Sequence, residues 1–523
     1  MRRSPIMLSV AVFGIATSLV ASSLSAQAPL RPQIDAWRAK HEREILDEAF
    51  GLLAIPNVAS DTANIARNVT FITQAFAKRG VTLTTLRAAA GGNPVIFGEL
   101  KAPKATRTVV FYAHYDGQPV AGGGWDGEPF APGLFRYRNS VAVEPMPLPA
   151  PEATVDPELR IRARSASDDK GPIVAMLAAL DAIKAAGRSP DVNIKFFFDG
   201  DEEAGNDHLG ELLREHKAKL QADAWLFFDG PTHVSGKPQL VLGVRGVMGV
   251  NLTFYGPNRA LHSGHYGNWA PNPAVSAAHF IASLRSPDGE VKIPGFYDDV
   301  PPPSAADRAL AQSLSTTDDS VRTSLGLAHT EANNAPLAER IMRPALNIRG
   351  IRAGNVGDGS SNAVPTSATV SIDFRLVPRQ SPERIRQLIE QHLTAQGYTI
   401  TADANAAARS TDRSRLVHIA WGDGYTSVQV PATLPAVQAV RRLMARGYGV
   451  EPYLMPILGG SLPLFHFVDQ LGATVITVPT VNADNSQHAP NENLRLQNLW
   501  DGIGVIAELM TGLGREWPRD LIK

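Results

Sequence analysis

Apolar residues in the first half of the chain form short blocks that alternate with stretches of helical periodicity. Segments 108–112, 192–198 and 225–228 are almost continuously apolar, which is typical of strands buried on both faces of a sheet. Segments 63–79 and 170–187 carry apolar residues at helical spacing. Strands that alternate with helices predict an α/β unit whose mostly parallel sheet is covered by helices.

The pattern changes after about residue 240. Segments 240–254 and 368–376 alternate between apolar and polar residues, as half-exposed antiparallel strands do. A buried-strand pattern returns close to the C-terminus. We therefore predict that residues 29–240 and 458–523 form one domain, and that residues 241–457 form a second, α+β domain inserted into it.

The N-terminus has the layout of a secretory signal. Arg2 and Arg3 precede an apolar run over residues 6–20, and small residues fill 21–28. We predict that residues 1–28 are a signal peptide and that no membrane span remains after its removal. The chain has no cysteine, which excludes disulfides, thiolate nucleophiles and cysteine-bound zinc. A large exported protein without disulfides suggests a bacterial periplasm.

Composition narrows the function classes further. The chain has 523 residues, 44% of them hydrophobic, which is enough for a sizeable core. Its formal net charge of -1 argues against a protein that binds nucleic acid or membrane surfaces.

A cluster of carboxylates follows the apolar block that ends at residue 198. Asp199, Asp201, Glu202 and Glu203 lie where open α/β sheets bind their ligands. Carboxylates that crowd together repel one another unless cations neutralise them. The alternative interpretation is a solvated acidic turn.

Four more polar residues share this placement at or near predicted strand ends. His114 ends a strand, and Asp116 is placed to hold its second ring nitrogen. Asp168, Asp229 and His488 lie in turns or loops, where capping and turn roles are the alternatives. Two imidazoles with carboxylates and no thiolate suit two zinc ions, with manganese or cobalt as substitutes. One carboxylate must then bridge the ions, and Glu202 remains free to act as a general base.

The motifs together resemble those of the M20 family of metallopeptidases, which includes dipeptidases, glutamate carboxypeptidases and aminoacylases. They occur in family order from about residue 35 onwards. The matching segments are FYAHYDGQPV, SASDDKGP, FDGDEEAG, FFDG, ALHSGHYGNWAPNP, SNAVP, DFRLVP, GGSLP and QHAPNEN.

The resemblance implies a role for each ligand. His114 and Asp229 would bind one metal, Glu203 and His488 would bind the other, and Asp168 would bridge both, with a cis peptide bond after it. Asp116 would orient His114. Glu202 would accept a proton from the attacking water and return it to the leaving amine.

The resemblance also implies residues that contact the substrate. His262, in the inserted dimerisation-type domain, would polarise the scissile carbonyl, and in dimeric members it reaches in from the partner subunit. We therefore expect a homodimer. Arg375, Asn362 and Ser461 match positions near the carboxylate end of the substrate, although Asn362 and Ser461 would also suit ordinary turns.

Some positions depart from the family pattern. Residues 163–167 read ARSAS where the family often has GRGAS, and Ile457 and Leu458 stand where dipeptidase relatives often carry charge. The resemblance implies hydrolysis of dipeptides or short peptides that have a free C-terminal carboxylate. An aminoacylase on the same fold is the nearest alternative, and a non-catalytic peptide-binding protein is the alternative from another class.

Overall fold

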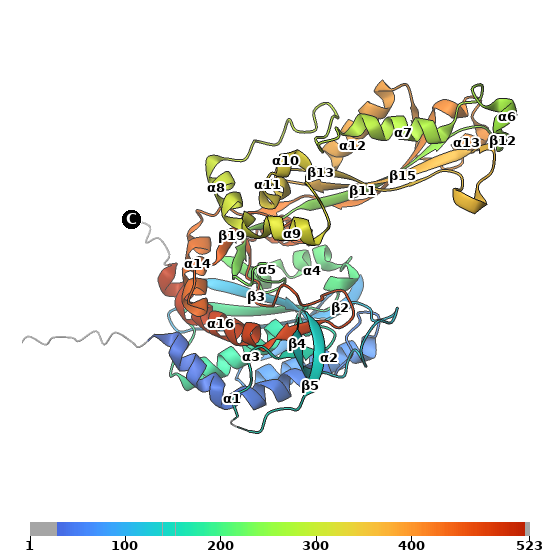
Figure 1. Ribbon diagram of the computed structural model, residues 1–523. Helices are drawn as coiled ribbons and strands as arrows, with labels where there is room; N and C mark the ends of the chain where they lie inside the picture. Colours follow the sequence, from blue (N-terminus) through green and yellow to red (C-terminus); the bar gives the residue numbers. More distant parts are fainter. Residues whose placement is uncertain (1–28, 139, 152, 518–523) are drawn as a thin grey trace, which may run out of the picture.

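The computed structural model describes residues 29–138, 140–151 and 153–517, which form a larger and a smaller unit (Figure 1). The predicted signal peptide, residues 1–28, lies outside these residues. Across the described ranges, no helix combines the length and the apolar character that crossing a bilayer requires.

An eight-stranded sheet in the order β1-β2-β7-β3-β8-β20-β9-β19 forms the centre of the larger unit. Its strands are β1 (Leu83–Ala88), β2 (Gly91–Leu100), β3 (Thr108–His114), β7 (Asn193–Asp199), β8 (Ala224–Phe227), β9 (Gln239–Val241), β19 (Tyr453–Met455) and β20 (Val475–Thr477). The central strands β7, β3, β8 and β20 are parallel, as predicted. The antiparallel pairs β1–β2, β2–β7 and β20–β9 make the complete sheet mixed.

Successive side chains of the central strands enter two different hydrophobic cores. Phe111, Phe196 and Phe198 pack on one face, and Tyr112 and Phe197 pack on the other. Because both faces are covered, these strands are apolar at every position. The first face is covered by α1 (Leu30–Leu53), α2 (Thr62–Ala77), α3 (Lys170–Ala185) and α16 (Leu496–Glu516), and the second by α4 (Leu209–Glu215), α5 (Lys217–Leu220) and α15 (Phe465–Leu471).

The smaller unit is built on a five-stranded sheet in the order β13-β15-β11-β17-β16. Its strands are β11 (Gly246–Tyr255), β13 (Ala345–Arg352), β15 (Ser367–Leu376), β16 (Thr399–Thr401) and β17 (Leu416–Tyr425). The predicted alternation is confirmed in β15, where Val370, Ile372 and Phe374 are buried beneath α7 (Pro273–Leu284) and α12 (Pro382–Ala395). Asp373 and Arg375 therefore lie on the opposite face, which is open towards the larger unit (Figure 1).

The inserted segment returns to the larger unit earlier than predicted. The sequence predicted a boundary after residue 457, but α14 (Pro435–Tyr448) packs on α16 in the core of the larger unit. A Cβ atom at Gly447 would lie only 2.7 Å from Val505, so the two helices meet closely here. The chain thus rejoins the larger unit near Val430, which is part of the same core. An amphipathic pattern predicts that α14 buries one face, but it does not identify the domain against which that face packs.

A small sheet brings together two loops that are distant in the sequence. Its strands, in the order β21-β6-β4-β5, are β4 (Gly133–Arg138), β5 (Val141–Met146), β6 (Arg160–Arg162) and β21 (Asn493–Arg495). The β6–β21 pairing sets the loop before β21, residues 486–492, against the loop after β6, residues 163–169. These two loops carry His488 and Asp168.

The buried carboxylate of Glu492 fastens these loops to each other. It accepts a hydrogen bond from Arg164 Nη1 at 2.7 Å and from the backbone N–H groups of Ser165, Ser167 and Asp168 at 2.9, 3.0 and 2.9 Å. The Ser167 hydroxyl also donates to it at 3.0 Å. One carboxylate therefore fixes the path of the backbone that leads into Asp168.

Removing this carboxylate should destabilise the fold. We expect Glu492→Ala to lower the free energy of unfolding by about 3–5 kcal/mol, because Arg164 would be left as an unpaired buried charge. Urea denaturation followed by circular dichroism measures the change. The matched control is Glu44→Ala, which removes an exposed carboxylate on α1 and should leave the midpoint almost unchanged. Equal midpoints for both variants would contradict this account.

Candidate metal centre

Three strand ends meet at one edge of the large sheet. β3 ends at His114, and Asp229 follows β8 by two residues. β7 ends at Asp199, after which the chain turns through Glu202 and Glu203. The parallel register of β3 and β7 pairs His114 with Asp199, so the acidic turn starts beside the imidazole. The carboxyl ends of parallel strands are the usual place for a ligand in such sheets.

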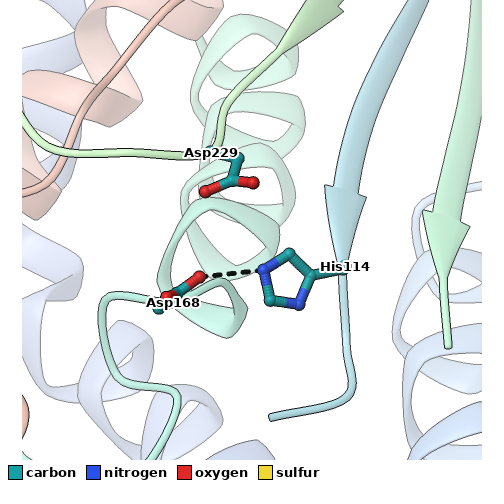
Figure 2. Close-up of side chains that lie close together, drawn as sticks. All are labelled: His114, Asp168 and Asp229. Carbon is teal, nitrogen blue, oxygen red and sulfur yellow. Dashed lines mark hydrogen bonds and ion pairs between the residues drawn. The ribbon is translucent and has the colours of Figure 1, made fainter. Parts of the chain in front are cut away.

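His114, Asp168 and Asp229 form the first group of candidate metal ligands (Figure 2). One ligand atom from each lies within 4.8 Å of the others, and all three residues are buried. His114 Nε2 is 2.8 Å from Asp168 Oδ1. These three residues come from the ends of β3 and β8 and from the loop that precedes α3, so tertiary folding is needed to bring them together.

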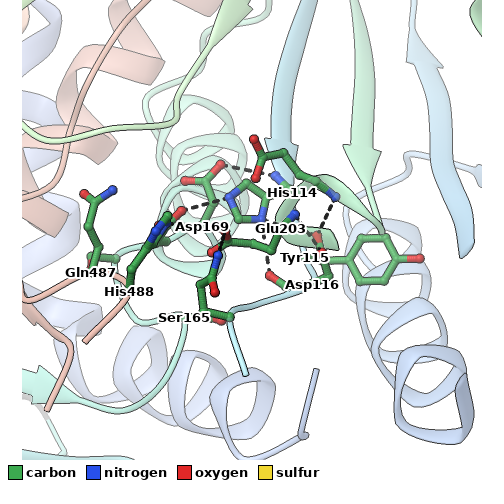
Figure 3. A network of polar contacts seen from close by, with 12 residues as sticks. His114, Tyr115, Asp116, Ser165, Asp169, Glu203, Gln487 and His488 are labelled. Carbon is green, nitrogen blue, oxygen red and sulfur yellow. Dashed lines mark hydrogen bonds and ion pairs between the residues drawn. The ribbon is translucent and has the colours of Figure 1, made fainter. Parts of the chain in front are cut away.

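Asp168, Glu203 and His488 form the second group, also within 4.8 Å of one another. His488 Nε2 lies 3.0 Å from Asp168 Oδ2 and 3.3 Å from Glu203 Oε2 (Figure 3). Asp168 is therefore common to both groups and turns one oxygen to each histidine. Two cations that share a carboxylate need this arrangement.

The charges of the site fit divalent cations. Burial raises the pKa of Glu203 to about 7 and that of Asp229 to about 6, and the nearby charge of Asp168 adds to both shifts. Burial also opposes ionisation of Asp168, but hydrogen bonds from His114 and His488 hold its pKa well below the usual value. Carboxylates in such a cluster keep protons unless cations neutralise them. A donor set of two imidazoles and three carboxylates fits two zinc ions, and also manganese or cobalt.

Asp116 connects His114 to the acidic turn. Its Oδ1 lies 3.5 Å from His114 Nδ1, and its backbone oxygen lies 3.2 Å from the same nitrogen. Its carboxylate also accepts hydrogen bonds from the backbone N–H groups of Glu202 and Glu203, at 3.1 and 3.0 Å (Figure 3). A single buried side chain thus contacts both the imidazole and the turn that carries the candidate carboxylates Glu202 and Glu203.

Glu202 lies beside the ligands but belongs to neither ligand group. Burial raises its pKa well above the usual value. The negative charges of Asp229 and Glu203 add to this shift, and His114 offsets part of it. A carboxylate with a raised pKa next to a metal site is suited to accept and return a proton.

The peptide bond between Asp168 and Asp169 is cis, as the resemblance implies. Asp169 is buried, and its Oδ2 accepts the backbone N–H of His114 at 3.2 Å. The next residue, Lys170, is also buried and donates to two backbone carbonyls at the end of α1, at 3.0 and 2.8 Å. This loop is therefore tied both to β3 and to α1.

Arg375 and Ser461 form a second polar group at the base of the inserted sheet. Arg375 Nη1 donates to Ser461 Oγ at 2.9 Å, and Arg375 Nε lies 3.4 Å from Asp373. Arg245 is close enough that burial, together with the charge of Arg375, lowers its pKa to about 10. It donates to the Gly459 carbonyl at 3.1 Å. Two guanidinium groups and one carboxylate leave a net positive charge here.

His262 and Asn362 lie elsewhere. β12 (Leu261–His262) pairs with β14 (Ala363–Val364), and the N–H of Ser263 donates to the Asn362 carbonyl at 2.8 Å. Both His262 and Asn362 are exposed. β12 lies at the end of the smaller unit that is remote from the large sheet (Figure 1). One chain therefore does not bring these two residues to the metal ligands.

Several residues around the site were not singled out from the sequence. Gln118 Nε2 donates to Glu203 Oε2 at 2.7 Å, and Asn206 donates to both oxygens of Asp199 at 2.8 Å. Gln118 and Glu492 lie inside the motifs FYAHYDGQPV and QHAPNEN, so the motifs could have identified them as residues near the site. The sequence alone could not identify Asn206, because its contact with Asp199 depends on the path of the turn between them.

Known proteins resemble this chain in sequence and in fold. The chain is 27% identical to the Cys-Gly metallodipeptidase dug1 of Schizosaccharomyces pombe over 431 residues, which are 81% of this chain and 84% of that protein. It is 24% identical to the Beta-Ala-His dipeptidase of Homo sapiens over 430 residues, 79% of this chain and 76% of that protein. The crystal structure of the M20 family metallo-carboxypeptidase Sso-CP2 from Sulfolobus solfataricus matches with a TM-score of 0.70 at 27% identity, covering 90% of this chain and 99% of that chain.

The family model for peptidase family M20/M25/M40 matches residues 110–512. This range includes every candidate metal ligand and most of both structural units. The chain therefore belongs to peptidase family M20/M25/M40 and is a peptidase.

Proposed function

We propose that this protein is a secreted metallodipeptidase that uses two divalent cations, with zinc as the first choice and manganese or cobalt as substitutes. The observation that carries the proposal is that Asp168 belongs to both ligand groups. Two relatives whose names specify dipeptide substrates support the substrate class. The signal-like N-terminal sequence supports secretion, and the lack of cysteine supports a periplasmic location.

The group around Arg375 favours substrates with a free C-terminal carboxylate. Arg375 presents a planar fork of donors, which suits bidentate binding of a carboxylate. Ser461 holds this guanidinium from the side, and Arg245 adds a second positive charge. A dipeptide bound here by its carboxylate would direct its peptide bond towards the metal ligands and Glu202.

In the proposed reaction, each candidate residue has a separate role. His114 and Asp229 would hold one cation, Glu203 and His488 the other, and Asp168 both. Bound cations supply Lewis acidity that polarises a carbonyl and makes water easier to deprotonate. Glu202 accepts the proton of the attacking water and returns it to the leaving amine. Asp116 keeps His114 in the tautomer and orientation that ligation needs.

A homodimer would complete the site. His262 and Asn362 lie together on an exposed tip, where the partner subunit's His262 would be free to reach a second active site and donate to the carbonyl oxygen. On the same tip, Tyr266 and Trp269 are 36% and 78% exposed with their ring centroids 6.1 Å apart, and neighbouring exposed aromatic residues are typical of protein interfaces. These exposed groups support a dimer formed through the smaller unit.

A substrate panel tests this function. We expect the zinc-loaded enzyme to hydrolyse unblocked dipeptides with a kcat/KM at least about tenfold above that for matched C-terminal amides, because the amides cannot pair with Arg375. The panel also includes N-acetyl amino acids. Faster turnover of these compounds than of dipeptides would show that the enzyme is an aminoacylase instead. Metal binding without hydrolysis of any compound would favour a non-catalytic peptide-binding protein.

Mixed dimers test the contribution of His262. We expect Glu202→Gln and His262→Ala each to lose at least about a hundredfold in kcat. When the two variants are co-expressed in equal amounts, about half of the dimers contain one subunit of each variant. In each of these mixed dimers, one of the two active sites has both an intact Glu202 and an intact His262. The mixture should therefore recover about one quarter of wild-type activity.

Two controls accompany the mixing experiment. Glu202→Gln should retain its full metal content, and Asp207→Asn, which changes an exposed acid just after the same turn, should keep wild-type activity. If no ratio of the two inactive variants restores turnover, His262 does not act across a dimer.

A further inference from the structure

Tyr425 lies at the junction between the inserted sheet and the larger unit. It is the last residue of β17, and its ring stacks on Phe465, the first residue of α15, with a centroid distance of 4.8 Å and an interplanar angle of 11°. The β17–β11 pairing sets Tyr425 opposite Val247, and Val247 also pairs with Arg375 on β15. The stack therefore fixes the phenol in the same cross-strand row as the predicted carboxylate-binding arginine.

The phenol belongs to a polar chain that begins at Arg375. Arg375 Nη1 donates to Ser461 Oγ at 2.9 Å, and the Ser461 hydroxyl is close enough to Tyr425 to lower the pKa of its phenol. A guanidinium group can only donate, so Ser461 Oγ accepts this bond. The Tyr425 O–H is itself a donor, which suits a ligand carboxylate bound at Arg375.

The charges around Tyr425 show which groups it faces. Burial raises the pKa of the phenol, so it remains a protonated donor near neutral pH. The charge of Arg375 lowers this pKa and that of Glu202 raises it, which means that both groups act on the phenol. Tyr425 is therefore near both the predicted carboxylate anchor and the predicted general base.

We propose that Tyr425 is a substrate-binding residue whose hydroxyl donates a hydrogen bond to the C-terminal carboxylate of the peptide held by Arg375. This inference rests on the proposed dipeptidase function. Arg375 and Arg245 supply the charge, and Tyr425 supplies a directed donor in the same cross-strand row as Arg375.

Tyr425→Phe tests the inference, because it keeps the stack on Phe465 and removes only the hydroxyl. We expect KM for dipeptides to rise about tenfold while kcat changes by less than about twofold, since one hydrogen bond to a charged group is lost. For the C-terminal amides, kcat/KM should stay near the wild-type value. The preference of the enzyme for a carboxylate over an amide should therefore fall about tenfold.

The matched control is Tyr255→Phe, at the opposite end of β11, whose hydroxyl donates to the Ala404 carbonyl at 3.3 Å. It should leave both KM and the preference for a carboxylate unchanged. If Tyr425→Phe keeps the wild-type preference, with or without a lower melting temperature, Tyr425 has only a packing role and the inference is wrong. If the wild-type enzyme itself does not prefer the carboxylate, the proposed substrate class fails instead.

Discussion

The site depends on one carboxylate that has an imidazole on each of its oxygens. Asp168 is buried, and its contacts with His114 and His488 hold together residues that are 374 positions apart in the sequence. Around it, Glu203 and Asp229 are carboxyls whose pKa values burial and repulsion raise. This repulsion works against the cluster unless positive charge enters it, so the same crowding that destabilises the empty site favours divalent cations.

The rest of the fold supports this cluster from outside. The parallel register of β3, β7 and β8 brings their ends together, and their alternating side chains are buried in two cores, one on each face. Glu492 then holds the two loops that the strands do not control, and Asp116 holds the acidic turn. The predicted metal ligands are therefore positioned by buried polar groups that belong to neither ligand group. Such support gives a site the rigidity that catalysis needs.

Arg375 and His262 lie at opposite ends of the smaller unit. Arg375 and Tyr425 are at the end near the larger unit, where they contact the loop that contains Ser461. His262 is at the remote tip. Within a single subunit, the arginine predicted to bind the substrate carboxylate and the histidine predicted to polarise the scissile carbonyl are thus far apart. The proposed dimer would overcome this separation, because a second copy would bring its tip with His262 to the active site of the first.

The sequence predicted those parts of the structure that leave a local pattern. Phe196 to Phe198 is apolar because both faces of β7 are buried, and the acidic turn after it follows from the strand end. The motifs also indicated which distant residues would meet. The return of the chain at α14 was not predicted, since amphipathicity does not identify the packing partner. Tyr425 was not predicted either, because its place depends on the register of β17 against β11 and on the position of α15.

The metal content of single-ligand variants tests most directly whether Asp168 serves two cations. Inductively coupled plasma mass spectrometry of the purified protein should find about two ions per chain in the wild type and about one in Asp229→Asn or Glu203→Gln. Asp168→Asn should bind neither ion tightly, although it removes only one carboxylate. If Asp168→Asn instead loses no more metal than either other variant, the two ligand groups are independent and the shared carboxylate is not the centre of the site.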